Sequence, residues 1–149
     1  MYLIDAYLTY KRVCFMKYVI NKLLLLIIIT FLGYTFVNKV FNYNAFTINI
    51  AKTGVFRGGW VDIVATYALI SESICMLLLV AKERIGFIVT FFVLTSFTLY
   101  ILYLKLTNAY EICGCGGILN GLPFHWHIVI NLLLILSLTY LFYQNEKDN

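Results

Sequence analysis

Four apolar stretches dominate the chain, and each is long enough to cross a lipid bilayer. A helix needs about 20 predominantly apolar residues to span a hydrocarbon core of roughly 30 Å. Because the bilayer core offers no water to backbone polar groups, uninterrupted stretches of this length fold as helices there. The sequence therefore predicts an all-α membrane protein. The four stretches cover residues 18–37, 60–80, 86–106 and 125–143.

The composition leads to the same class of protein. Hydrophobic residues make up 62% of the 149 residues and charged residues only 12%, whereas a soluble domain carries about 25% charged residues. We therefore expect a single membrane domain over residues 18–143, with a short segment at 1–17 and a tail at 144–149. The basic residues near the N-terminus flank an apolar run instead of forming a basic stripe, so nucleic-acid binding is not expected.

The connections between the stretches predict how the helices are arranged. Residues 82–84 carry three charges between the second and third stretches, and so short a turn requires an antiparallel hairpin. Residues 38–59 alternate polar with apolar side chains, which is typical of an amphipathic segment at the membrane interface. The prediction is an antiparallel bundle of four transmembrane helices, with this segment between the first two.

The lysines and arginines predict the orientation. The N-terminus, the 82–84 turn and the C-terminus lie on one side and carry seven basic residues, whereas the other side carries four: Lys39, Lys52, Arg57 and Lys105. Basic residues favour the cytoplasm, so both termini are expected inside a bacterial inner membrane. The run after Met16 is similar to a signal peptide, but no small-residue cleavage site follows it, and we expect the first helix to be retained. If Met16 is the true start, residues 1–15 carry no function.

A cysteine pair in the last loop is the main candidate for chemistry. Cys113 and Cys115 are separated by Gly114 and followed by Gly116 and Gly117, on the side expected to be oxidising. Gly114 removes the side chain that would crowd a ring closed by the two cysteines. Strained, exposed disulfides of this kind are more often catalytic or regulatory than structural. Thiol–disulfide exchange, a structural disulfide or free thiols, and a metal site all remain open.

Two histidines follow the cysteine pair and define the metal alternative. Cys113, Cys115, His125 and His127 supply two sulfurs and two nitrogens, of the type that zinc or copper accepts. However, the spacing matches no established zinc signature. His127 and Asn131 are four residues apart and share one helical face. His127 is expected either to pack at the interface or to support a proton relay or a thiolate, and Asn131 needs a partner from another helix.

Glu72 is an acidic residue near the middle of the second stretch. A charged side chain there costs about 2.5 kcal/mol or more, so such residues usually face the interior of the bundle and mark function. Three interpretations are open: a protonated packing residue that accepts hydrogen bonds from Thr95 and Ser96, a contact for a proton or a quinone headgroup, or one partner of an ion pair. Cys75 is expected to be a small buried hydrophobe and Cys14 a free cytoplasmic thiol.

Taken in order, these residues resemble the MauE-type membrane proteins of methylamine utilisation, which belong with a wider DoxX-like four-helix group. The resemblance covers about residues 20–142 and is specific at the Cys113–Gly117 segment. The residues that carry it are Gly33, Lys39, Phe46, Glu72, Cys113, Gly114, Cys115, Gly116, Gly117, Trp126 and Asn131. It implies a redox-associated accessory protein that helps to form disulfides in exported enzymes, with Cys113 and Cys115 as the exchanging pair. Relatives of this kind often act alongside thioredoxin-fold partners. The chain departs from many relatives in having Gly116 where they carry an aromatic residue, and in lacking a proline before Glu72.

The sequence thus leads to one hypothesis and two alternatives. The leading hypothesis is a membrane-embedded thiol–disulfide accessory protein whose Cys113/Cys115 pair faces the periplasm and exchanges disulfides with a thioredoxin-like partner or an exported substrate. The first alternative is a non-catalytic subunit or assembly factor of a larger membrane complex. The second is a subunit linked to a quinone or a metal through Glu72 or the Cys/His loop.

Overall fold

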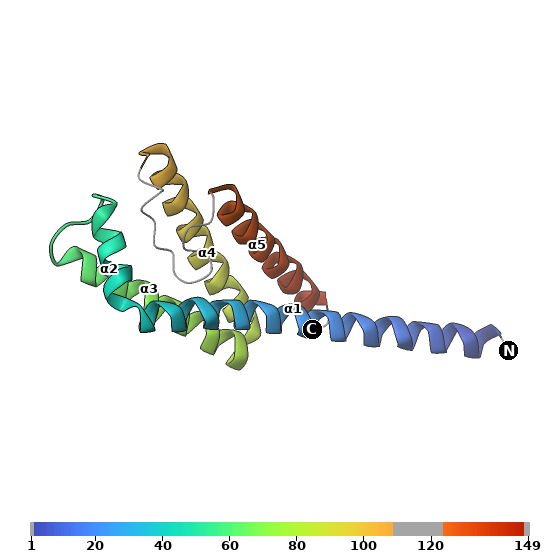
Figure 1. Ribbon diagram of the computed structural model, residues 1–149. Helices are drawn as coiled ribbons and strands as arrows, with labels where there is room; N and C mark the ends of the chain where they lie inside the picture. Colours follow the sequence, from blue (N-terminus) through green and yellow to red (C-terminus); the bar gives the residue numbers. More distant parts are fainter. Residues whose placement is uncertain (1, 109–123, 148–149) are drawn as a thin grey trace.

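The computed structural model describes residues 2–108 and 124–147, and these residues form helices joined by short turns (Figure 1). The all-α prediction is confirmed. Cys113, Cys115 and the glycines around them lie outside the described residues. The helices are α1 (Tyr2–Phe41), α2 (Tyr43–Lys52), α3 (Trp60–Ala81), α4 (Glu83–Leu106) and α5 (Phe124–Lys147).

Four of these helices are long and apolar enough to cross a membrane, as predicted. The candidate spans are Phe15–Phe41, Trp60–Ala81, Glu83–Leu106 and Phe124–Lys147. The first lies within a single continuous helix that begins at Tyr2, so the N-terminal part of α1 extends beyond the other helices (Figure 1). The short helix α2 occupies the segment expected to be amphipathic, and it buries Phe46 and Ile50.

Single residues with non-helical backbone angles separate α1 from α2 and α3 from α4, whereas a longer turn joins α2 to α3. Lys82, at φ −145° and ψ 75°, stands alone between α3 and α4 and forms the predicted hairpin. Asn42 has φ −113° and ψ 36° and separates α1 from α2. The turn from α2 to α3 contains Gly54 and Gly58 at φ values of 72° and 58°, a conformation that other residues rarely adopt.

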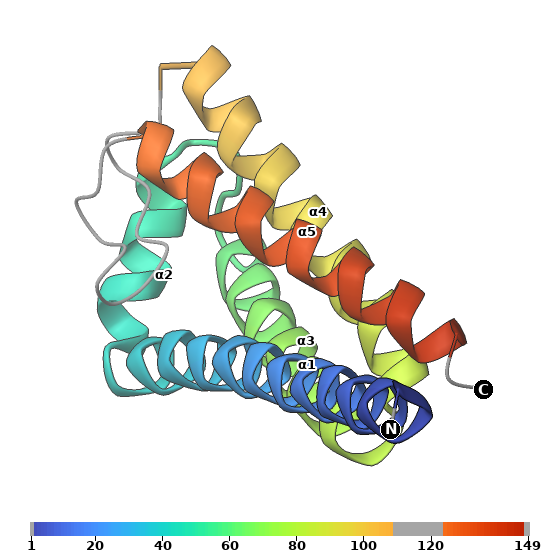
Figure 2. The same cartoon turned by 90° about the vertical axis from the view of Figure 1, so that its right-hand side faces the viewer.

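The helices pack in chain order, α1 on α3, α3 on α4 and α4 on α5. Seen from the side, α1 and α5 diverge, and α2 lies at the open end between them (Figure 2). The central core is apolar, which is expected for helices that associate by close packing in a lipid environment. The ten buried residues of this core are Leu25, Ile28, Leu32, Cys75, Leu79, Phe87, Leu94, Leu134, Leu138 and Leu141. Cys75 is fully buried, as predicted.

Two ion pairs mark the opposite end of the bundle from α2. Lys22 of α1 pairs with Glu83, and Arg84 pairs with Glu146 of α5. The middle of α1, the α3–α4 turn and the end of α5 are therefore held together at one end of the bundle, as the four-span topology requires. Both pairs are partly exposed, and such pairs contribute little to stability.

Candidate functional site

An ion pair between Lys39 and Glu72 lies buried near the α2 end of the bundle. Lys39 is in the last turn of α1 and Glu72 lies in the middle of α3. The Lys39 Nζ contacts Glu72 Oε1, and the two residues are only 6% and 2% exposed. Because an isolated charge is strongly disfavoured in this environment, each side chain makes the burial of the other tolerable.

This geometry distinguishes two interpretations of Glu72, namely hydrogen bonding to Thr95 and Ser96 and pairing with a cation. The expected hydrogen bonds from α4 are wrong, because Thr95 donates to the Phe91 carbonyl at 2.7 Å and the described partner of Glu72 is Lys39. The ion-pair interpretation is the one that the structure supports. Lys39 was expected in the interfacial segment 38–59, whereas it lies in the last turn of α1 and is buried in this ion pair. Glu72 needs a cation, which a neighbouring Thr or Ser does not supply.

Two aromatic rings complete the surroundings of the Lys39 ammonium. Its Nζ lies 5.6 Å from the centre of the Phe46 ring of α2 and 5.4 Å from that of Phe97 of α4. A cation at this distance from an aromatic face is stabilised by the ring quadrupole, and more so when it is desolvated. Lys39 therefore joins side chains from α2, α3 and α4 to the end of α1.

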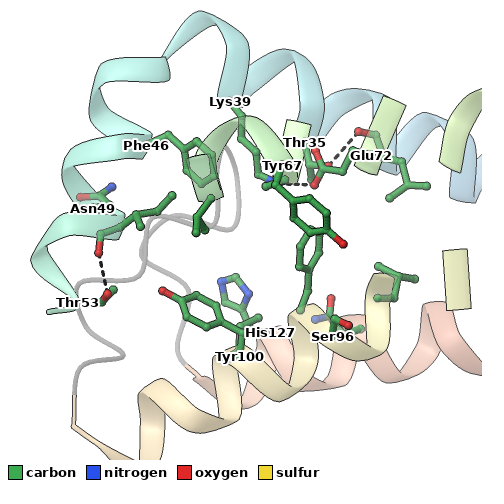
Figure 3. Close-up of a pocket in the computed structure, with 18 of the residues that line it drawn as sticks. Thr35, Lys39, Phe46, Asn49, Thr53, Tyr67, Glu72, Ser96, Tyr100 and His127 are labelled. Carbon is green, nitrogen blue, oxygen red and sulfur yellow. Dashed lines mark hydrogen bonds and ion pairs between the residues drawn. The ribbon is translucent and has the colours of Figure 1, made fainter. Parts of the chain in front are cut away.

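The ion pair faces a partly open cavity of about 330 Å³, which we call the chamber (Figure 3). All five helices contribute to its walls, which are mainly apolar and aromatic. A few polar side chains reach it as well, and Figure 3 shows Tyr67, Tyr100 and His127 directed into the same space as the ion pair. Ligand pockets typically have this size and this mixture of apolar walls with a few polar groups.

Glu72 brings a buried acceptor to the chamber that has no donor among the described residues. The second carboxylate oxygen of Glu72, Oε2, is buried and accepts no hydrogen bond from any residue that the structure describes. A buried acceptor without a donor typically costs about 1–3 kcal/mol. The chamber therefore offers an unused acceptor directly beside a buried ammonium group.

His127 and Asn131 are both buried and both line the chamber, in agreement with their predicted common face. Asn131 Nδ2 donates to Thr98 Oγ1 of α4 at 3.2 Å, which is the inter-helix partner that its position required. His125, in contrast, is exposed and lies beside Trp126, with ring centres 5.8 Å apart and ring planes tilted by 47°. The two imidazoles thus lie on different sides of α5.

The predicted cysteine pair and its glycines, Gly114, Gly116 and Gly117, lie outside the described residues, so thiol chemistry and the Cys/His metal site stay predictions. Among residues 2–108 and 124–147, no group of three or more His, Cys, Asp or Glu side chains could hold a metal ion. The two helix ends that precede and follow the pair, Leu106 of α4 and Phe124 of α5, are described. Lys105 Nζ lies 5.8 Å from the Phe124 ring centre, so these two ends are neighbours.

Sequence reasoning did not assign Lys39 or Phe97 to the site. The sequence did contain an indication for Lys39, because a buried carboxylate requires a cation and Lys39 lies two residues after the end of the expected first span. The signal was ambiguous, since Lys39 also suits the end of a helix at the membrane interface. Phe97 carried no signal, because the chain contains 12 phenylalanines and most of them suit a lipid-facing or packed position equally well.

A bundle of four candidate spans around a chamber with a buried ion pair defines a multi-pass membrane protein. The model of the family described as methylamine utilisation protein MauE matches residues 16–144. The match covers most of the chain, which therefore belongs to the MauE family, as its resemblance indicated. No curated protein and no solved structure matches it.

Proposed function

We propose that this MauE-family protein acts in thiol–disulfide exchange at the outer face of the bacterial inner membrane, as an accessory protein of methylamine utilisation. The family description supplies the pathway, and the Cys113/Cys115 pair supplies the chemistry. An exported enzyme or a thioredoxin-fold protein would be the partner. Both termini would lie in the cytoplasm, and the α2 end of the bundle would face the periplasm.

The observation that carries this proposal is the common location of the chamber and the helix ends before and after the cysteine pair. The end of α4 and the start of α5 are neighbours, and both lie at the end of the bundle where α1 and α5 diverge (Figure 2). The pair is thus joined through short connections to two helices that also line the chamber. This end carries fewer basic residues than the other, which favours the periplasm for it, and disulfides persist in that compartment.

The exchange itself needs only the two sulfurs and a partner. The Cys113 thiolate attacks a partner disulfide, forms a mixed disulfide and releases one partner thiolate. Cys115 then attacks Cys113 Sγ, closes the Cys113–Cys115 disulfide and releases the second partner thiolate. The cysteine pair is oxidised and the partner reduced. The same steps in reverse transfer a disulfide to an exported enzyme.

Replacing the second cysteine tests the proposal. Without Cys115 the mixed disulfide cannot be resolved, so Cys115→Ala is expected to accumulate a covalent complex that appears on non-reducing gels and disappears with reductant. Cys75→Ala is the matched control, because Cys75 is buried in the core and both motif cysteines remain. If Cys115→Ala forms no mixed disulfide and still supports methylamine utilisation, the thiol–disulfide proposal is wrong.

A further inference from the structure

We propose that the chamber is a binding site for the headgroup of a lipid-soluble quinone. The evidence for this binding site is the geometry of the chamber alone. Only the role of the bound quinone as electron acceptor for the cysteine pair depends on the proposed function.

The chamber places a hydrogen-bond acceptor, the Glu72 carboxylate, beside a hydrogen-bond donor, the Lys39 ammonium. Glu72 Oε2 is an acceptor with no donor among the described residues, and the Lys39 ammonium next to it is a donor only. A quinol hydroxyl would donate to Glu72 Oε2, and a quinone carbonyl would accept from Lys39 Nζ. One ion pair therefore suits both redox states of the same molecule. An acyl chain would satisfy neither group and would leave the buried acceptor without a partner.

The walls suit a flat ring. The ring centres of Phe46 and Phe97 lie 5.6 Å and 5.4 Å from Lys39 Nζ, so a ring whose oxygen reaches the ammonium would have both of them nearby. Phe56 and Tyr100 form a second aromatic pair in the wall, with ring centres 6.2 Å apart. Aromatic pairs of this kind contribute beyond their buried area.

The chamber also opens to the outside of the bundle. Tyr67 of α3 lines it and is nevertheless 67% exposed, so the wall beside Tyr67 is an outer surface of a membrane-spanning helix. A molecule dissolved in the bilayer can therefore reach the ion pair without passing through water. A quinone headgroup would enter there, and its isoprenoid tail would remain in the lipid.

A quinone at this position would complete the proposed redox function. When two cysteine thiols close to a disulfide they release two electrons and two protons, and a quinone that takes up both becomes the quinol. The chamber is lined by Tyr100 in the second half of α4 and by His127 near the start of α5, the parts of these helices that lead toward the cysteine pair. The quinone pool would thus keep the pair oxidised.

The test of the site is binding of decylubiquinone to the full chain in phosphatidylcholine nanodiscs. Binding is measured by quenching of the intrinsic protein fluorescence. Saturable quenching is expected. Phe97→Leu removes a wall ring and should weaken binding about fivefold, whereas Phe92→Leu on the outer face of the same helix, 65% exposed, should leave it unchanged. Glu72→Gln should weaken binding of the reduced form, decylubiquinol, about tenfold.

The outcomes separate this inference from the proposed function. The double variant Cys113→Ser with Cys115→Ser should bind decylubiquinone as tightly as the native chain, so a failed thiol exchange does not alter this result. Three results would overturn the quinone site. They are quenching that does not saturate, equal affinities of the Phe97→Leu and Phe92→Leu variants for decylubiquinone, and displacement of bound decylubiquinone by palmitic acid as effectively as by unlabelled quinone. The last result would assign the chamber to an acyl chain.

Discussion

Lys39 and Glu72 place two opposite charges inside a bundle whose outer faces are mainly apolar. Removal of both charges from water is costly, and their attraction offsets this cost only while both are present. The pair joins the end of α1 to the middle of α3 at a position where α1 diverges from α5. We therefore regard it as the interaction that fixes how α1 and α3 are held together beside the chamber.

Removal of one partner should show this dependence. Lys39→Met leaves the Glu72 carboxyl buried without a cation, and we expect the free energy of unfolding to fall by about 3 kcal/mol. The double variant Lys39→Met with Glu72→Met should recover most of this loss, since no buried charge remains. Unfolding by sodium dodecyl sulfate in mixed micelles measures both. The control Lys52→Met, an exposed lysine of α2, should change stability by less than about 0.5 kcal/mol. A double variant as unstable as the single one would contradict the pairing.

Asn131 and Thr98 form a second polar contact, between α5 and α4. Hydrogen bonds between membrane helices average about 0.6 kcal/mol, so we expect Asn131→Ala to lower the free energy of unfolding by roughly that amount. Thr98→Val should have a similar effect, and the double variant should add little further. A double-mutant cycle in the same unfolding assay measures the coupling. Strictly additive losses would show that the 3.2 Å contact contributes nothing.

The hairpin of α3 and α4 depends on close backbone packing at Gly86. A Cβ atom added there would lie 2.6 Å from the Leu79 backbone nitrogen and 2.7 Å from the Leu78 carbonyl carbon. These are backbone atoms that cannot rotate away. The hairpin must therefore open or shift to accept any side chain at this position.

We expect Gly86→Ala to destabilise the protein by about 1–3 kcal/mol, the usual cost of overpacking. Gly33→Ala is the matched control, because Gly33 is also helical and its added Cβ would meet only Met76 Sδ at 3.6 Å. There the higher helix propensity of alanine should keep stability equal or raise it. Thermal unfolding of both variants in the same detergent compares them. Equal melting temperatures would show that α3 and α4 do not approach as closely as described.

The sequence predicted the helices better than the contacts between them. The second span was expected at residues 60–80 and α3 is Trp60–Ala81, because hydrophobic length depends on local sequence alone. The common face of His127 and Asn131 was also predictable, since it follows from helical periodicity. The partner of Glu72 was not, because Lys39 is 33 residues away and its approach depends on how α1 packs on α3. Apolar spans contain little information about such packing.

At the scale of the whole molecule, the two ends of the bundle differ in chemistry. One end holds the ion pairs of Lys22 with Glu83 and of Arg84 with Glu146. The other end holds α2 and the exposed Trp60 and Trp126, residues of a type that is enriched at the headgroup level of membranes. Lys39 pairs with Glu72 near that end, and Lys22 and Arg84 pair with acidic residues at the other end. Five basic residues at the end that carries the termini, and three near α2, therefore lie outside these ion pairs. The charge asymmetry keeps the direction that the sequence count implied.

This asymmetry predicts the orientation on which the proposed redox function depends. In a chain whose four native cysteines are replaced by serine, Val55→Cys in the α2–α3 turn should react with a membrane-impermeant maleimide on intact cells. Lys82→Cys in the α3–α4 turn should react only after permeabilisation. Both positions are exposed, so a difference in labelling reports the side of the membrane and not the accessibility of the residue. The opposite pattern would place the Cys113/Cys115 end in the reducing cytosol, where a disulfide would not persist. The chamber and its ion pair would then need a function without thiol exchange.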